Sequence, residues 1–143
     1  MSEEITTTET ASEAVEFGAE RVESSRAIVE AERVMPADFA HNAALHFAKA
    51  LRKHPRFADA LFGEDEEADA EYLLERARAE VDYLAKNNWL DAGMLAMCEL
   101  DEAQLAHSQG DKAACVSELY DAVAVLMRMI AVVEGKQKLG GEK

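Results

Sequence analysis

The stretch from Trp89 to Glu134 constrains the fold most, because it predicts two helices folded back on each other. Apolar residues recur at helical spacing on both sides of a short polar turn centred on Gly110. Four acidic residues lie at mirrored distances from this glycine, two before it and two after it: Glu99, Glu102, Glu118 and Asp121. If the two helices pack antiparallel, each mirrored pair meets at one height, and the four carboxylates come together.

The rest of the chain predicts an all-α fold of about five helices, with the hairpin as its C-terminal part. The 143 residues suit one domain, about half of them are apolar, and only two prolines interrupt the helical patterns. We expect a flexible acidic tail over 1–10, one helical domain over 11–134 and a second tail over 135–143. The helices before the hairpin are expected at the following places: 12–34, 37–53, a short helical turn at 56–62, and 68–86. The helix over 37–53 is expected to bury the face that carries Ala40, Ala44, Phe47 and Leu51, and Asn87-Asn88 is expected to end the helix over 68–86.

Charge and cysteine spacing exclude several classes of protein. The net charge of −14 opposes direct binding to nucleic-acid phosphates. No apolar run reaches membrane-spanning length, and the first residues lack the pattern of a signal peptide. Antiparallel helices would place Cys98 and Cys115 about 10 Å apart along the axis, which disfavours a disulfide between them. We therefore expect a cytoplasmic protein with no membrane partner.

The four acids share their helical strips with apolar residues, which indicates partial burial. Glu99 and Glu102 lie on a strip with Leu95 and Ala106, and the second pair lies on a similar strip. Partly buried carboxylates in a group of four need a positive partner to stay ionised. Mg²⁺, which prefers oxygen ligands, is the expected occupant. The spacing alone is not specific, because Glu13 and Glu16, for example, repeat it. A solvated acidic seam paired with arginines from elsewhere is the alternative.

The remaining candidates for chemistry are weaker. His41 and His46 are five residues apart, which does not place them as a clean pair of metal ligands on one helical turn. The two cysteines lie on apolar faces without a neighbouring cation in the sequence, which is typical of inert core residues. Trp89 is interpreted first as a packing anchor at the start of a helix, with stacking on a base as the alternative.

The hairpin resembles the all-α NTP pyrophosphatases, the MazG-like superfamily, over residues 89–133. The resemblance lies in Glu99-x-x-Glu102, a gap of fifteen residues, and Glu118-x-x-Asp121 followed by the apolar run from Ala122 to Met127. It implies that the four acids bind magnesium and take part in catalysis. It also implies hydrolysis of a nucleoside triphosphate to the monophosphate and pyrophosphate, and a homodimer or a larger homo-oligomer. Arg128 is the best local candidate for contacting phosphates, and Trp89 for contacting the base.

Two other functions stay open at this point. An acidic helical protein without catalysis would dock on a basic protein partner, as an inhibitor or a mimic of nucleic acid such as some phages encode. The high negative charge and the additional N-terminal helices favour this alternative. The other possibility is a structural subunit whose helices only assemble.

Overall fold

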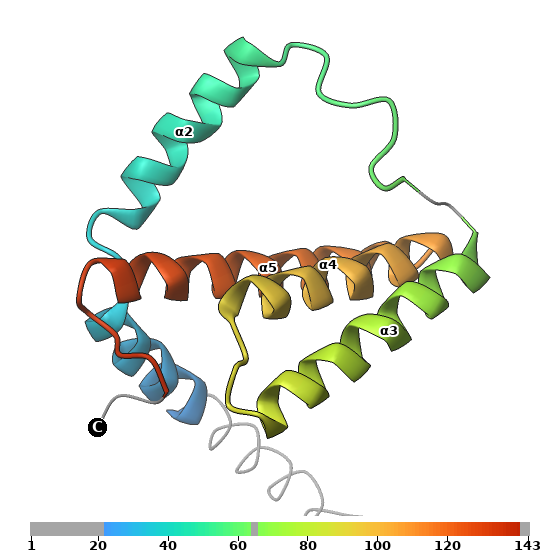
Figure 1. Ribbon diagram of the computed structural model, residues 1–143. Coiled ribbons are helices and arrows are strands. Elements are labelled where there is room, and N and C mark those ends of the chain that lie inside the picture. Colours follow the sequence, from blue (N-terminus) through green and yellow to red (C-terminus); the bar gives the residue numbers. More distant parts are fainter. Residues whose placement is uncertain (1–21, 64–65, 141–143) are drawn as a thin grey trace, which may run out of the picture. The chain divides into compact units, whose positions relative to one another are not determined.

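The protein is all-α, as the sequence predicts. The computed structural model describes residues 22–63 and 66–140, and these two ranges contain five helices and no strand (Figure 1). The chain divides into two compact units, Met1–Met35 and Pro36–Lys143, which are described separately below. The single domain over 11–134 stays a prediction, and the predicted 1–10 tail lies outside the described residues.

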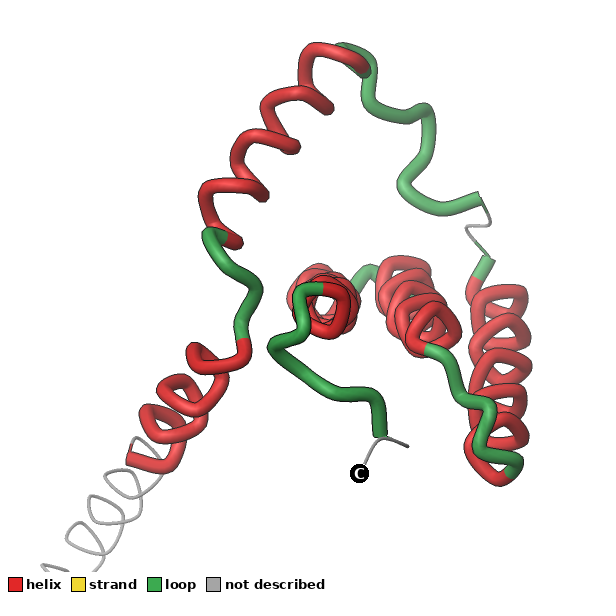
Figure 2. The backbone as a smooth tube through the Cα atoms, turned by 60° about the vertical axis from the view of Figure 1, so that its left-hand side comes forward, coloured by secondary structure: helices red, strands yellow, loops and turns green. Residues whose placement is uncertain are grey.

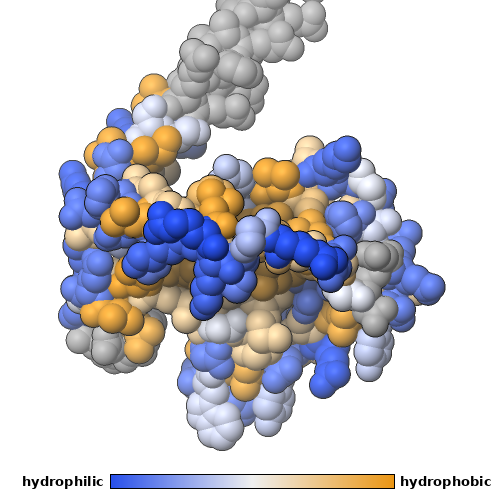
Figure 3. All heavy atoms as spheres, turned by 90° about the horizontal axis from the view of Figure 1, so that it is seen from above, coloured by the Kyte–Doolittle hydropathy of each residue, from blue (hydrophilic) through white to orange (hydrophobic). Residues whose placement is uncertain are grey.

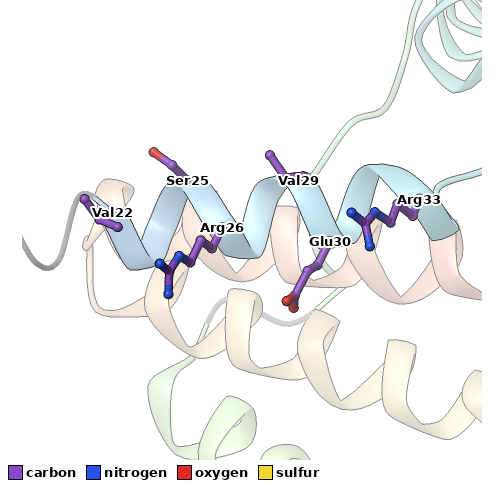
Figure 4. A pocket seen from close by; sticks show the side chains of 6 residues that line it. All are labelled: Val22, Ser25, Arg26, Val29, Glu30 and Arg33. Atoms are coloured by element: carbon purple, nitrogen blue, oxygen red, sulfur yellow. The ribbon is translucent and has the colours of Figure 1, made fainter.

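The first unit is described over one helix, residues 22–34, all of which are exposed. A shallow hollow runs along this helix, and its six lining side chains all project from the same helix (Figure 4). They include two arginines and a glutamate: Arg26, Arg33 and Glu30. Because one helix supplies every lining residue, this hollow is an open helical surface and not an enclosed site.

The second unit contains four helices. They are α2 (Phe39–Lys53), α3 (Glu67–Lys86), α4 (Ala92–Ser108) and α5 (Lys112–Val133). Helix α4 packs against α5 on one side and against α3 on the other (Figures 1 and 2). The predicted C-terminal hairpin is therefore present as α4 and α5, and α3 lies beside its first helix.

Residues suited to helix ends define the boundaries of the hairpin. Asp91 caps α4 by accepting a hydrogen bond from the backbone N–H of Met94 at 2.8 Å, and Asp111 caps α5 in the same way through Ala114 at 3.0 Å. Gly110 in the turn has a φ of 73°, a conformation that glycine adopts without steric cost. These local signals explain why the sequence places the turn correctly.

The core of the second unit consists mainly of small residues. Alanines on α3, α4 and α5 are buried, and the larger buried apolar residues are Leu74 and Cys115. In the described part of the chain no large side chain is fully buried. The tightest cluster joins α4 and α5 near their turn, at Ala103, Ala106 and Cys115. Small side chains allow two helix backbones to approach closely, so α4 and α5 can bring their polar side chains together.

Two of our predictions for residues 37–62 were wrong. We expected α2 to bury a face that includes Phe47 and Leu51, but α2 has no buried residue, and these two side chains are 67% and 59% exposed. Residues 56–62 do not form a helical turn. A segment this short, bounded by Pro55 and Gly63, gains too few hydrogen bonds to offset helix nucleation. Phe62 nevertheless packs on the core cluster, with its ring 5.6 Å from that of His107.

The surface mixes apolar and polar residues. On the face shown in Figure 3, apolar patches lie between strongly polar ones. Across the described ranges, no helix is long and apolar enough to cross a membrane.

Candidate metal centre

The contact between α4 and α5 places acidic residues among small ones. On α4, Glu99 lies one turn from Ala96 and one turn from Ala103, both of which are buried. On α5, Glu118 lies between two buried residues, Cys115 and Ala122. Residues three and four apart share a helical face. The glutamates therefore belong to the same face as the alanines that bring the helices together.

Three of the four predicted carboxylates converge. One carboxylate oxygen each of Glu99, Glu102 and Glu118 lies within 4.8 Å of the other two, and all three residues are half-buried. Oxygens around one Mg²⁺ at ~2.1 Å are about 3 to 4 Å apart, so small side-chain adjustments would bring all three onto one cation. Three oxygen ligands on one side leave further coordination positions for water or phosphate. This arrangement suits a hard divalent cation.

Asp121 does not join this group. It is exposed, whereas its neighbour Ala122 is buried. Asp121 shares a helical face with Glu118, but it lies at the solvent-exposed edge of the contact between α4 and α5, and its charge still acts on Glu99 and Glu118. The mirrored spacing therefore predicts the three acids that converge, and a role for Asp121 at the edge of the cluster stays a prediction.

A basic residue that sequence analysis did not select contacts the cluster. Arg78 on α3 donates a hydrogen bond from Nη2 to the Oε1 atom of Glu102 at 2.8 Å. The Arg78 side chain is 59% exposed and that of Glu102 is 25% exposed, so this ion pair is partly screened by solvent. Arg78 lies 24 residues before Glu102, and no local spacing signals their contact. Only the packing of α3 on α4 brings them together.

Two carboxyl groups of the cluster resist ionisation, those of Glu99 and Glu118. Partial burial raises the pKa of Glu99, and the negative charges of Glu102, Asp121 and Glu118 raise it further. Burial also raises the pKa of Glu118, followed by a carboxyl–carboxyl hydrogen bond with Glu102 and the charges of Glu102 and Asp121. Arg78 opposes this shift at Glu118. One arginine therefore does not fully offset the repulsion, and a bound cation would relieve it.

The same surroundings act on Cys98. Burial raises the pKa of its thiol, and the charges of Glu102 and Glu99 raise it further. Both cysteines are free thiols. A protonated thiol is a poor nucleophile, so Cys98 suits the inert role expected for it.

The raised pKa values predict how stability depends on pH. A carboxyl group whose pKa is higher in the folded state stabilises the fold fully below its unfolded pKa, and this contribution is lost as the pH rises through the folded pKa. We therefore expect the metal-free protein to lose stability as the pH rises from ~4.5 toward neutral. Thermal melting followed by circular dichroism at a series of pH values measures this. A Glu118→Gln variant, which removes one shifted group, should show a shallower decline. An equal decline in both proteins would contradict the assignment.

The two predicted substrate contacts lie away from the cluster. Arg128 is ten residues beyond Glu118, about 15 Å along α5. In the orientation that hydrogen bonding favours, the amide oxygen of Gln137 accepts from Arg128 Nη2 at 2.9 Å. Trp89 is 74% exposed and lies before the start of α4. The helix from its first residue, Ala92, to Glu99 spans about 10 Å. Arg78, and not Arg128, is the cation next to the carboxylates.

The chain matches no family model, no curated protein and no solved structure. The resemblance to the all-α NTP pyrophosphatases therefore stays a prediction from the spacing of the acidic residues.

Proposed function

We propose that the protein binds Mg²⁺ through Glu99, Glu102 and Glu118 and hydrolyses a nucleoside triphosphate to the monophosphate and pyrophosphate. The observation that carries this proposal is the convergence of three carboxylate oxygens within 4.8 Å at the contact between α4 and α5. The raised pKa of two of these groups supports it, because a site for a cation concentrates negative charge that the metal-free fold tolerates poorly.

Each residue would have a distinct part in this reaction. The three glutamates would hold the cation from the side of the helices. The cation would orient the triphosphate and lower the pKa of an attacking water. Arg78 would turn from Glu102 toward the phosphates, because its side chain is more than half exposed and its guanidinium can bind two phosphate oxygens. Asp121, exposed and one turn beyond Glu118, would accept the proton of the water.

A titration of the wild-type protein tests this proposal. We expect Mg²⁺ to raise the melting temperature, and one member of a panel of nucleoside triphosphates to raise it further when Mg²⁺ is present. The same mixture should release pyrophosphate, and omission of the metal should abolish the release. If Mg²⁺ raises the melting temperature but no nucleotide raises it further and no pyrophosphate is released, the protein has a metal site and is not a hydrolase of these nucleotides. No response to Mg²⁺ would reject both.

The contact between Arg78 and Glu102 favours a second candidate, an acidic helical protein that docks on a basic partner without catalysis. An arginine already neutralises one carboxylate of the cluster, as expected for a structural acidic seam. The net charge of −14 would attract a basic protein. For this candidate, affinity for the partner should fall steeply as salt rises. Binding that is equal at low and high salt would count against it.

A further inference from the structure

Helix α5 carries a second pattern, which its packing against α4 uses only at Leu119. Large apolar residues recur with a seven-residue period along its whole length. The first position of each heptad holds a β-branched residue, and the fourth position holds leucine or valine. We call these residues the heptad stripe: Val116, Leu119, Val123, Leu126, Ile130 and Val133. A β-branched residue at the first position and leucine at the fourth is the pattern of a two-stranded parallel coiled coil.

The heptad stripe is largely exposed. Val116 is 52% exposed, Leu126 is 50% exposed and Val133 is 87% exposed, while Val123 and Ile130 also exceed two-fifths. Only Leu119 is half-buried, at the edge of the core cluster. The buried residues Cys115 and Ala122 lie beside the stripe, and Cys115 packs against Ala103 and Ala106 of α4. On this helix, therefore, small residues are buried and most of the large apolar ones are not.

The charge of α5 indicates which kind of partner fits the stripe. The helix contains two basic and two acidic residues, so its net charge is zero, although the whole chain carries −14. None of the six stripe residues is polar, and the positions directly beside the middle of the stripe are uncharged: Tyr120, Ala122, Met127 and Met129. The two charged residues of this stretch, Asp121 and Arg128, lie on the side of the helix away from the stripe. Two copies of this acidic chain repel each other elsewhere, but they can approach along α5 without bringing like charges together.

We propose that two copies of the chain pair through the heptad stripe, with their α5 helices parallel. The stripe spans about 25 Å, and two such surfaces would bury on the order of 1,000 Å², close to the minimum for a specific interface. In a parallel pair each stripe residue meets its own equivalent, as the β-branched and leucine positions require. This inference does not rest on the proposed hydrolysis. Glu118 lies toward α4, so pairing leaves the carboxylates accessible.

Matched double substitutions on the full chain test the surface. In V116D/V123D, both changes place a charge on the stripe. In the control S117D/A124D, each change lies one residue further on, at an exposed position beside it. We expect sedimentation equilibrium to show a dimer for the wild type and the control. The dissociation constant of the V116D/V123D dimer should be about 100-fold higher than that of the wild type, because the introduced charges would be buried without partners. Circular dichroism should show equal helix content in all three.

Cysteine cross-linking tests the orientation and does not depend on a disruptive variant. Val116→Cys and Val133→Cys, at opposite ends of the stripe, should each form a disulfide with the same residue of the second copy, identified by peptide mass. An antiparallel pair would hold each cysteine about 25 Å from its equivalent and give neither disulfide. A wild type that stays monomeric at ~100 μM, well above the dissociation constants of specific dimers, would overturn the proposal. So would a dimer that V116D/V123D leaves intact, or the absence of both cross-links.

Discussion

A Glu118→Gln variant is expected to lose its response to Mg²⁺ and, with it, at least about 100-fold of any nucleotide hydrolysis. Glutamine keeps the size of the side chain and one oxygen, but it removes the negative charge and the ability to bind a cation as a carboxylate. Because Glu118 is the only member of the converging trio on α5, its loss leaves the two ligands of α4 alone. Thermal shift against Mg²⁺ concentration and pyrophosphate release measure the two effects.

The same substitution should have the opposite effect on the metal-free protein. Burial and neighbouring negative charges raise the pKa of Glu118, so its ionised form opposes folding near neutral pH. We therefore expect metal-free Glu118→Gln to melt at a higher temperature than the metal-free wild type. Glu80→Gln, at an exposed position of α3, is the matched control and should change neither property. A Glu118→Gln protein that still binds Mg²⁺ normally would reject the metal site. Lower metal-free stability would reject the electrostatic account.

An Arg78→Gln variant is expected to separate metal binding from catalysis. Removing the guanidinium frees Glu102 from its ion pair, so Mg²⁺ should bind as tightly as in the wild type or more tightly. Hydrolysis should nevertheless fall by roughly 10- to 100-fold, because the phosphates lose the nearest cation of the protein. Titration of Mg²⁺ without nucleotide, and pyrophosphate release at saturating Mg²⁺, measure the two effects separately.

Arg76→Gln provides the control for Arg78, since Arg76 is exposed on the same helix and carries the same charge. Its loss should leave both measurements unchanged. If Arg78→Gln lowers stability and leaves Mg²⁺ without any effect, the arginine is a structural counter-ion. That result would favour the acidic binding protein over the hydrolase.

The sequence predicts those parts of the molecule that local signals determine. The bounds of α3 and of the hairpin follow from apolar periodicity, from aspartates that suit helix starts, and from Gly110 in the turn. Asn88, in the stop predicted after α3, has a φ of 57°, as expected for a residue that tolerates left-handed backbone. The convergence of Glu102 and Glu118 follows from their equal distances to the turn. Each of these predictions depends only on residues of one helix or of two helices that follow each other in the sequence.

The remaining features depend on packing that helical periodicity does not specify. The sequence could not indicate that Arg78 would contact Glu102, because α3 and α4 are connected by a loop whose course decides which residues meet. A helix with apolar residues on two sides, such as α5, does not reveal which side faces its neighbour. Here the alanine-bearing side packs inward, and the valines and leucines remain outside. The wrong prediction for α2 has another cause: this helix has one apolar face, but none of its residues is buried by a neighbour.

The alanines between α4 and α5 have no side-chain atom that could bind a metal, yet they would set the size of the ion that the proposed site could hold. Ala103 is 0% exposed and lies next to Glu102, and Ala122 lies one turn from Glu118. A larger side chain at either position would push the helices apart and widen the spacing of the oxygens. Mg²⁺ requires ligands at ~2.0–2.1 Å, whereas Ca²⁺ accepts ~2.3–2.6 Å with looser geometry. In the proposed site, selectivity between the two ions would therefore depend on the helix spacing, and residues that do not touch the metal would determine it.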